Sequence, residues 1–104
     1  MQEVVLKELQ TALNTHSIVL EQTLDVEKAN QLRNQQRQLF EQMDRLVNER
    51  LTRQDSHWLE AIDSLKKHTK SAQQANQRLA QHSDVIHHAA NVIRVLDKVL
   101  TQAL

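Results

Sequence analysis

The chain has 104 residues, with 13 Lys and Arg against 13 Asp and Glu, one Trp, one Phe, and no glycine, proline or cysteine. This composition excludes disulfide scaffolds and thiol catalysis, and it argues against sheet folds, which need glycine-containing turns. Nucleic-acid binding is not expected, because it requires clustered Lys and Arg with stacking aromatic side chains.

No run of about 18 apolar residues occurs, so no membrane-spanning segment is expected. The apolar triplet 4–6 is followed at once by Lys7 and Glu8, which is unlike a secretory leader. The sequence therefore predicts one all-α domain over residues 1–104, located in the cytoplasm.

The first predicted helix covers about residues 3–24, where Leu and Val recur at spacings of three, four and seven. His16 stands where this stripe would place an apolar side chain. A second helix is predicted over 27–53, with Asp25 as its N-cap, since a carboxylate accepts from the free N–H groups of a first turn. Residues 33–38 are all polar, so a helix there is solvated on every side unless a partner covers it.

The third predicted helix covers 56–103 and has the clearest coiled-coil-like pattern, with steps of four and three that begin at Trp58. At 1.5 Å per residue this helix is about 70 Å long, against about 33 Å and 40 Å for the first two. Either it is broken near 82–84 into a fourth helix, or one end projects beyond the hairpin. The expected fold is an antiparallel bundle of three long helices.

Catalytic and metal sites are not indicated. No pair of histidines has the i,i+3 or i,i+4 spacing that would direct two rings from one helix to one metal ion. No nucleophile–base set and no glycine-rich loop occurs. We therefore expect no enzymatic activity, no metal and no cofactor. The histidines considered are His16, His57, His68, His82, His87 and His88.

The C-terminal segment is the predicted binding surface, because its wide apolar arc would be exposed if the last helix outran the hairpin. Exposed apolar patches of this size mark interaction sites. The alternatives are that the other helices cover the arc, or that it pairs with a second copy of the chain. Trp58 is interpreted as a core anchor, with an interface hot spot as the alternative. The predicted partner-binding residues are Asn76, Leu79, Ile86, Ala90, Ile93, Leu96 and Leu100.

The order of residues also resembles the flagellar export chaperones of the FlgN type. The resemblance lies in the segments 20–24 (Leu-Glu-Gln-Thr-Leu) and 37–40 (Arg-Gln-Leu-Phe), and in a third helix that opens at Trp58 and contains Asn76. It implies a cytosolic chaperone without catalysis. Such a chaperone holds the amphipathic C-terminal segment of a hook–filament junction protein and delivers it to a type III export apparatus.

Two other classes of function remain open at this point. One is a self-associating structural element, such as a coiled-coil homodimer with a shared helical core. The other is a small regulatory protein that binds an unrelated partner.

Overall fold

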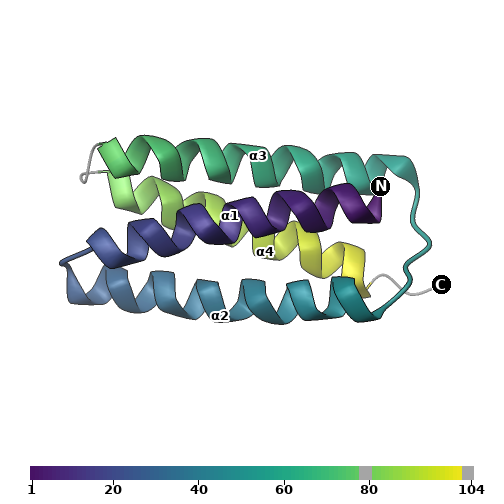
Figure 1. Ribbon diagram of the computed structural model, residues 1–104, viewed down its shortest axis with the longest axis horizontal. Helices are drawn as coiled ribbons and strands as arrows, with labels where there is room; N and C mark the ends of the chain where they lie inside the picture. The colour runs from purple at the N-terminus through teal and green to yellow at the C-terminus, as the bar shows by residue number, and fades with distance from the viewer. Residues whose placement is uncertain (78–80, 102–104) are drawn as a thin grey trace.

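In the computed structural model, the described residues form a bundle of four helices of similar length, and the molecule measures 42 × 20 × 17 Å (Figure 1). The structure describes residues 1–77 and 81–101, with side chains up to residue 75 and again from 81 to 101. The helices are α1 (Gln2–Gln22), α2 (Val26–Asn48), α3 (Asp55–Gln77) and α4 (His82–Thr101).

The chain is all-α, but the predicted arrangement of three long helices is wrong. The third predicted helix ends as α3 at Gln77, and α4 begins at His82, within the region 82–84 where the sequence analysis considered a break into a fourth helix. The apolar spacing continues across this break because each of the two helices has its own buried stripe. Folding α4 back along α3 buries both stripes, whereas one helix of about 70 Å would leave an end uncovered.

The four helices form two hairpins that lie side by side in the same orientation. α1 packs against α2 and α3, and α4 packs against α3 and α2, so that α1/α4 and α2/α3 lie on the diagonals of the bundle (Figure 1). The second predicted helix ends at Asn48, not 53, and the connection 49–54 crosses one end of the bundle to reach α3. As a result, α1 runs parallel to α3, and α2 runs parallel to α4.

Buried glutamines join the parallel helices α2 and α4. Gln35 Nε2 donates to the Ile86 carbonyl at 2.8 Å, and Gln42 Nε2 donates to the Ile93 carbonyl at 2.9 Å. Both pairs are separated by 51 residues in the sequence, so the two helices keep one register. Within the polar run 33–38, the bundle therefore covers only one side of the helix: Gln35 is buried and Gln36 is half-buried, whereas the other four residues are exposed.

The core consists of two apolar clusters at opposite ends of the bundle. The cluster near the connection 49–54, called here the large cluster, contains Val5, Leu9, Ala12, Leu13, Leu39, Leu46, Trp58, Ala61, Leu65, Val92, Val95, Leu96, Val99 and Leu100. The cluster near the other end, called the small cluster, contains Val19, Leu32, Ala72, Ala75 and Val85. The larger share of apolar stabilisation therefore comes from one half of the bundle.

The predicted N-cap of the second helix is confirmed. Asp25 precedes α2 in an extended conformation, and its Oδ1 accepts from the Lys28 backbone N–H at 2.9 Å. This bond satisfies one of the four backbone donors that a helix N-terminus leaves free.

Replacing this cap tests how much it stabilises the bundle. We expect Asp25→Ala to lower the free energy of unfolding by about 1 kcal/mol, because the side-chain acceptor is lost. Urea denaturation followed by circular dichroism measures the change. Asp44→Ala, at an exposed position inside α2, is the matched control and should change stability by less than about 0.5 kcal/mol. Equal losses in the two variants would contradict a capping role.

Within the described residues, no helix combines the length and apolar character that crossing a membrane requires.

Candidate functional site

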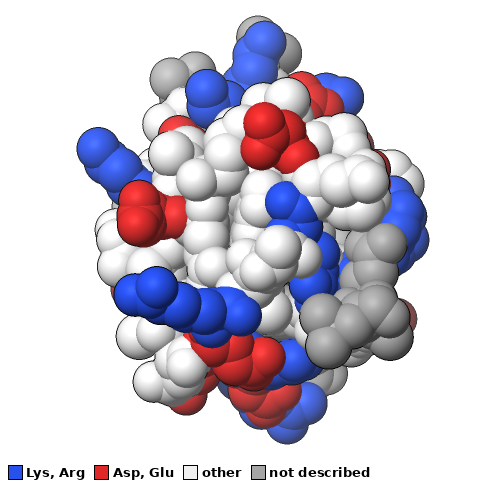
Figure 2. All heavy atoms as spheres, turned by 90° about the vertical axis from the view of Figure 1, so that its right-hand side faces the viewer, with Lys and Arg blue, Asp and Glu red and all other residues white. Residues whose placement is uncertain are grey.

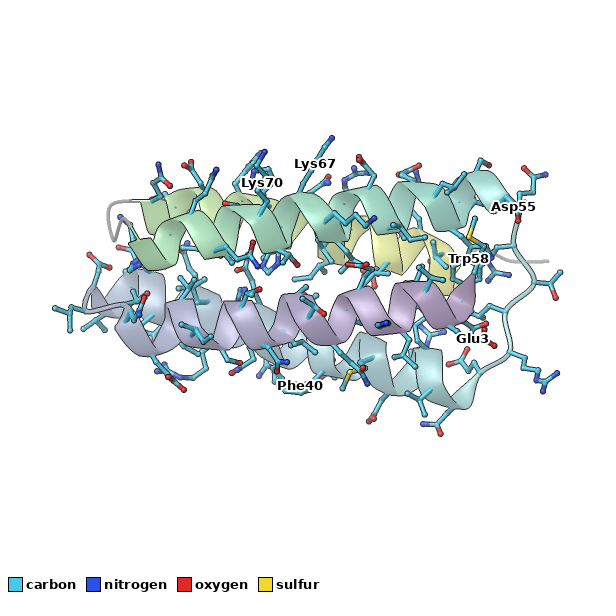
Figure 3. The ribbon with its side chains drawn as sticks, turned by 45° about the horizontal axis from the view of Figure 1, so that its top comes forward. Glu3, Phe40, Asp55, Trp58, Lys67 and Lys70 are labelled. Carbon is cyan, nitrogen blue, oxygen red and sulfur yellow. The ribbon has the colours of Figure 1, made fainter. Side chains whose placement is uncertain are left out.

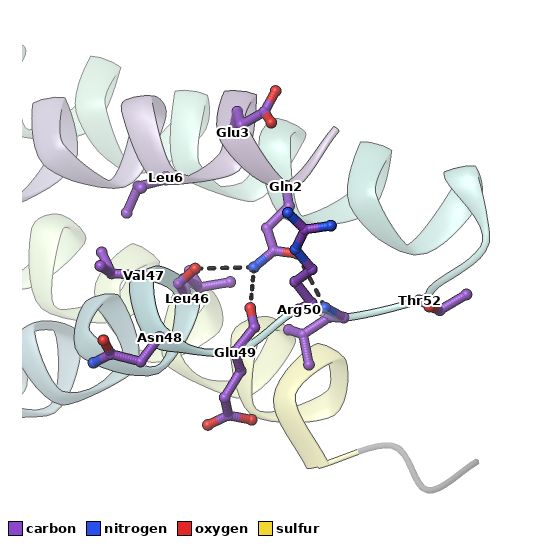
Figure 4. Close-up of a pocket in the computed structure, with 10 residues that line it drawn as sticks. Gln2, Glu3, Leu6, Leu46, Val47, Asn48, Glu49, Arg50 and Thr52 are labelled. Atoms are coloured by element: carbon purple, nitrogen blue, oxygen red, sulfur yellow. Dashed lines mark hydrogen bonds between the residues drawn. The ribbon is translucent and has the colours of Figure 1, made fainter.

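A cavity of about 630 Å³ opens at the end of the bundle where the connection 49–54 leaves α2 (Figure 4). It lies between the first turn of α1 and the last turn of α2. Its lining consists of Gln2, Glu3, Leu6, Leu46, Val47, Asn48, Glu49, Arg50, Leu51 and Thr52.

Gln2 forms one wall of this cavity and links α1 to the end of α2 by hydrogen bonds (Figure 4). Its Nε2 donates to the carbonyls of Leu46 at 2.9 Å and Glu49 at 2.6 Å. Its Oε1 accepts from the Leu51 backbone N–H at 3.2 Å. The last carbonyls of a helix lack intrahelical partners, so the Gln2 side chain serves as a cap supplied by a neighbouring helix. The cavity therefore has a wall held by three hydrogen bonds.

An apolar strip begins at this cavity and continues along the face of α2 that carries Val47. Leu6 and Val47 line the cavity, and Phe40 and Met43 lie on the same face of α2 as Val47, at spacings of seven and four residues. Phe40 is 47% exposed and Val47 is 61% exposed. Figure 3 shows Phe40 projecting from the bundle beside α1. These four residues are called the apolar strip below.

The charges around the cavity are mixed. Arg45 forms a bidentate pair with Glu49, with N–O distances of 2.8 and 3.2 Å, and it also donates to the Leu100 carbonyl at 3.1 Å. The hydrogen bond from Arg45 holds the pKa of the Glu49 carboxyl below its usual range. Figure 2 looks onto this end of the molecule and shows basic and acidic side chains interspersed among uncharged ones. On this face the surface attracts neither strong anions nor strong cations over a long range.

A polar layer separates the two apolar clusters in the middle of the bundle. Each helix contributes one residue between its large-cluster and small-cluster positions: His16 from α1, Gln35 from α2, His68 from α3 and Ala89 from α4. All four are buried. His16 Nδ1 lies 3.1 Å from His68 Nε2, and His16 Nε2 lies 2.8 Å from the Leu32 carbonyl oxygen.

Burial lowers the pKa of both rings. Desolvation is the largest cause for His68 and lowers its pKa from 6.5 to about 3, with the nearby His16 and His88 adding to the shift. Desolvation also lowers the pKa of His16, and the hydrogen bond to the Leu32 carbonyl opposes it. Both imidazoles are therefore neutral in the folded protein near pH 7.

A second buried histidine contact lies at the far end of the bundle. Thr23 Oγ1 donates to the Val19 carbonyl at 2.7 Å, so its lone pair is free to accept from His82 Nδ1 at 3.1 Å. This contact joins the end of α1 to the start of α4. Burial, followed by the charge of Lys28, lowers the pKa of His82.

The predicted partner-binding residues of α4 take several different positions. Leu96 and Leu100 are buried in the large cluster, Ile86 and Ile93 are half-buried, and Ala90 is exposed. The length argument for an uncovered arc fails with the three-helix fold, because α2 and α3 both pack against α4. Contact of this arc with a partner stays a prediction. Leu79 and the side chain of Asn76 lie outside the described residues.

The other sequence candidates are placed as follows. Trp58 is 4% exposed and belongs to the large cluster, in agreement with its interpretation as a core anchor. In the described part of the chain, no three His, Asp or Glu side chains are grouped so that they could hold a metal ion.

Sequence reasoning missed the His16–His68 pair because it searched for ligands within single helices. The steps of four and three from Trp58 placed Ile62 and Thr69 on the buried side of this helix. In the structure Ala61 and His68 are buried instead, and Ile62 and Thr69 are half-buried. One signal was visible, since His16 interrupted the apolar stripe of the first helix. Its partner 52 residues away became apparent only in the folded chain.

Comparison with known proteins identifies no relative: no family model, no curated protein and no solved structure matches the chain. The fold therefore gives the class of protein: the described residues form a small all-α bundle of four helices, in which two helical hairpins lie side by side in the same orientation.

Proposed function

We propose that this chain is a non-catalytic cytoplasmic binding protein that holds an amphipathic helix of a partner protein. The resemblance to FlgN-type export chaperones supplies the class of client, the amphipathic C-terminal segment of a hook–filament junction protein. The observation that carries the proposal is the apolar strip beside the cavity, not the C-terminal arc on which the sequence prediction relied.

The geometry of the strip suits a helical client. Phe40, Met43 and Val47 follow the spacing with which one helix face contacts another, and they extend over about 10 Å, or two turns. An amphipathic helix laid in an apolar groove would bring its own residues at i, i+3 and i+7 against them. The cavity at the end of the strip would take a larger side chain of the client.

The stacked arrangement of the hairpins explains why this groove is available. The inner side of the α1/α2 hairpin is covered by α3 and α4. Leu6 and Met43 of the strip pack partly against the large cluster, whereas Phe40 and Val47 are exposed. Among the described residues, no helix packs onto this outer groove. A client helix bound there would extend the stack by one more helix and would bury the exposed side chains of Phe40 and Val47.

A paired substitution tests the proposal. We expect Phe40→Glu with Val47→Glu to weaken binding of peptides from the C-termini of hook–filament junction proteins by about 100-fold. Each lost apolar contact of about 1.4 kcal/mol corresponds to a factor of ten. Isothermal titration calorimetry with a sequence-scrambled peptide as reference measures the affinity. Circular dichroism should show an unchanged fold, because both positions are exposed.

The control variant is Leu59→Glu, at a position on α3 that is 54% exposed and lies outside the strip. It should leave the affinity unchanged. Equal affinity of the double variant and the native chain would overturn the proposed surface.

The alternative occupant is a second copy of the chain, which the sequence also left open. Light scattering over a range of concentrations separates the two cases. A dimer mass that falls to a monomer mass in the Phe40→Glu, Val47→Glu variant would assign the strip to self-association instead of a client.

A further inference from the structure

The hydrogen-bond geometry of the polar layer fixes the tautomers of two buried histidines. A carbonyl oxygen only accepts, so His16 Nε2, at 2.8 Å from the Leu32 oxygen, must carry a hydrogen. In the neutral ring His16 Nδ1 is then a lone pair, and the hydrogen of the 3.1 Å contact belongs to His68 Nε2. The rings are inclined by 24° with centroids 5.3 Å apart, which suits such an in-plane bond.

His68 Nδ1 ends this chain of hydrogen bonds. It is buried and has no hydrogen-bond partner among the described residues. When His68 Nδ1 carries only a lone pair, the folded chain loses one acceptor interaction there. When it carries a hydrogen in addition to Nε2, the ring is charged and the N–H is a buried donor without an acceptor, which costs more.

Neither ring can take up a second proton without breaking the layer. A proton on His16 Nδ1 would either set two N–H groups against each other across 3.1 Å or, if His68 moved its hydrogen to Nδ1, leave that N–H buried without an acceptor among the described residues. A proton on His68 Nδ1 would leave a buried cation without an acceptor. The pair is thus compatible with the fold in one protonation state only.

The groups that face the pair do not compensate a positive charge. His16 approaches His68 from α1, and His88 acts on His68 from α4, and both interactions disfavour a positive charge on His68. α2 contributes the Leu32 carbonyl, which His16 already occupies. Neither ring bonds to a carboxylate within the described parts of the chain.

We propose that the His16–His68 pair is an acid-sensitive switch, which holds the small-cluster half of the bundle closed only while both imidazoles are neutral. The small cluster has five buried members, two of them alanines, so it depends on the neighbouring polar layer for its closure. The large cluster is broader and keeps its own contacts. Protonation therefore opens the turns at residues 23–25 and the start of α4 before it affects the half that contains Trp58.

The sign of the effect follows from the direction of the shifts. The folded pKa values lie below the ordinary value of 6.5, so the opened state binds more protons in acid. Stability that the pair contributes is fully present above pH 6.5 and is lost as the pH falls from 6.5 toward 3, the folded value for His68. Between about pH 7.5 and pH 5 the opening equilibrium constant rises about thirtyfold from His68 alone, and His16 adds in the same direction.

Residue-resolved hydrogen exchange tests the switch. After correction for intrinsic rates, we expect the amide protection of Val85 and Ala89 in α4 to fall by at least about thirtyfold between about pH 7.5 and pH 5. The emission of Trp58, in the large cluster, should stay unchanged over the same interval. Unchanged protection would overturn the proposal, and so would a shift of Trp58 emission that accompanies the loss of protection.

The variant His16→Leu with His68→Leu removes both titrating groups and leaves no unpaired partner between them. It should make the acid-induced fall in Val85 protection at least about thirtyfold smaller than in the native chain, because the proton-linked contribution of the pair has been removed and only that of His82 remains in this half of the bundle. His87→Gln, at an exposed position of α4, is the matched control and should behave like the native chain. If the double leucine variant loses protection in acid as the native chain does, the switch lies elsewhere.

A measurement on the native chain does not depend on any variant folding. Long-range proton–nitrogen correlation spectra report the tautomer of each histidine. We expect both His16 and His68 as neutral rings protonated at Nε2, and neither should titrate with the pKa of a surface histidine, about 6.5. Titration of either ring near 6.5 in the folded protein would contradict the proposal.

Discussion

Leu96→Asp is expected to abolish folding of the chain near neutral pH. Leu96 is fully buried in the large cluster, where α4 packs against α2 and α3. The substitution loses about 1.5–3 kcal/mol of apolar burial and in addition places an unpaired carboxylate in the core, which costs several kcal/mol. The sum is comparable to the whole stability of a small domain, about 5–15 kcal/mol. Far-UV circular dichroism should show loss of most helical signal.

The matched control for this variant is Ala90→Asp, at an exposed position of the same helix. It should fold and should change stability by less than about 0.5 kcal/mol. The comparison also decides a question that the sequence left open, namely whether Leu96 acts in the core or at an interface. A Leu96→Asp variant that folds normally and loses only association would contradict its placement in the core.

Trp58→Ala is expected to lower the free energy of unfolding by about 3–5 kcal/mol, the range for removal of a large buried aromatic side chain. Trp58 stands near the start of α3 and closes the large cluster at the end where the chain crosses from α2. For a domain of this size, 1 kcal/mol corresponds to about 4–8 °C in Tm, so thermal melting should show a decrease of at least about 12 °C.

The neighbouring residue provides the control. Leu59 is 54% exposed, and Leu59→Ala should shift Tm by no more than about 4 °C. Similar shifts for the two variants would mean that Trp58 does not anchor the core.

Local chemistry could be predicted from the sequence, because it depends on residues that are close along the chain. The absence of Gly and Pro together with the apolar spacing indicated helices throughout, since nothing in the chain interrupts a helix strongly. The Asp25 cap was predicted because its bond to Lys28 lies within one turn. The burial of Trp58 followed from its place at the head of an apolar stripe.

The number of helices and the buried polar layer were decided by the tertiary structure. An apolar stripe reports which face of a helix is buried but not whether the helix continues, so the pattern ran on across the break between α3 and α4. Likewise, the spacing within α3 placed Ile62 and Thr69 on the buried stripe, and only the folded chain showed that Ala61 and His68 are the buried positions. The pairing of His16 with His68 and of Gln35 with the Ile86 carbonyl depends on which hairpins stack and in what register. That choice is made by the shape complementarity of whole helices, which no spacing within one helix encodes.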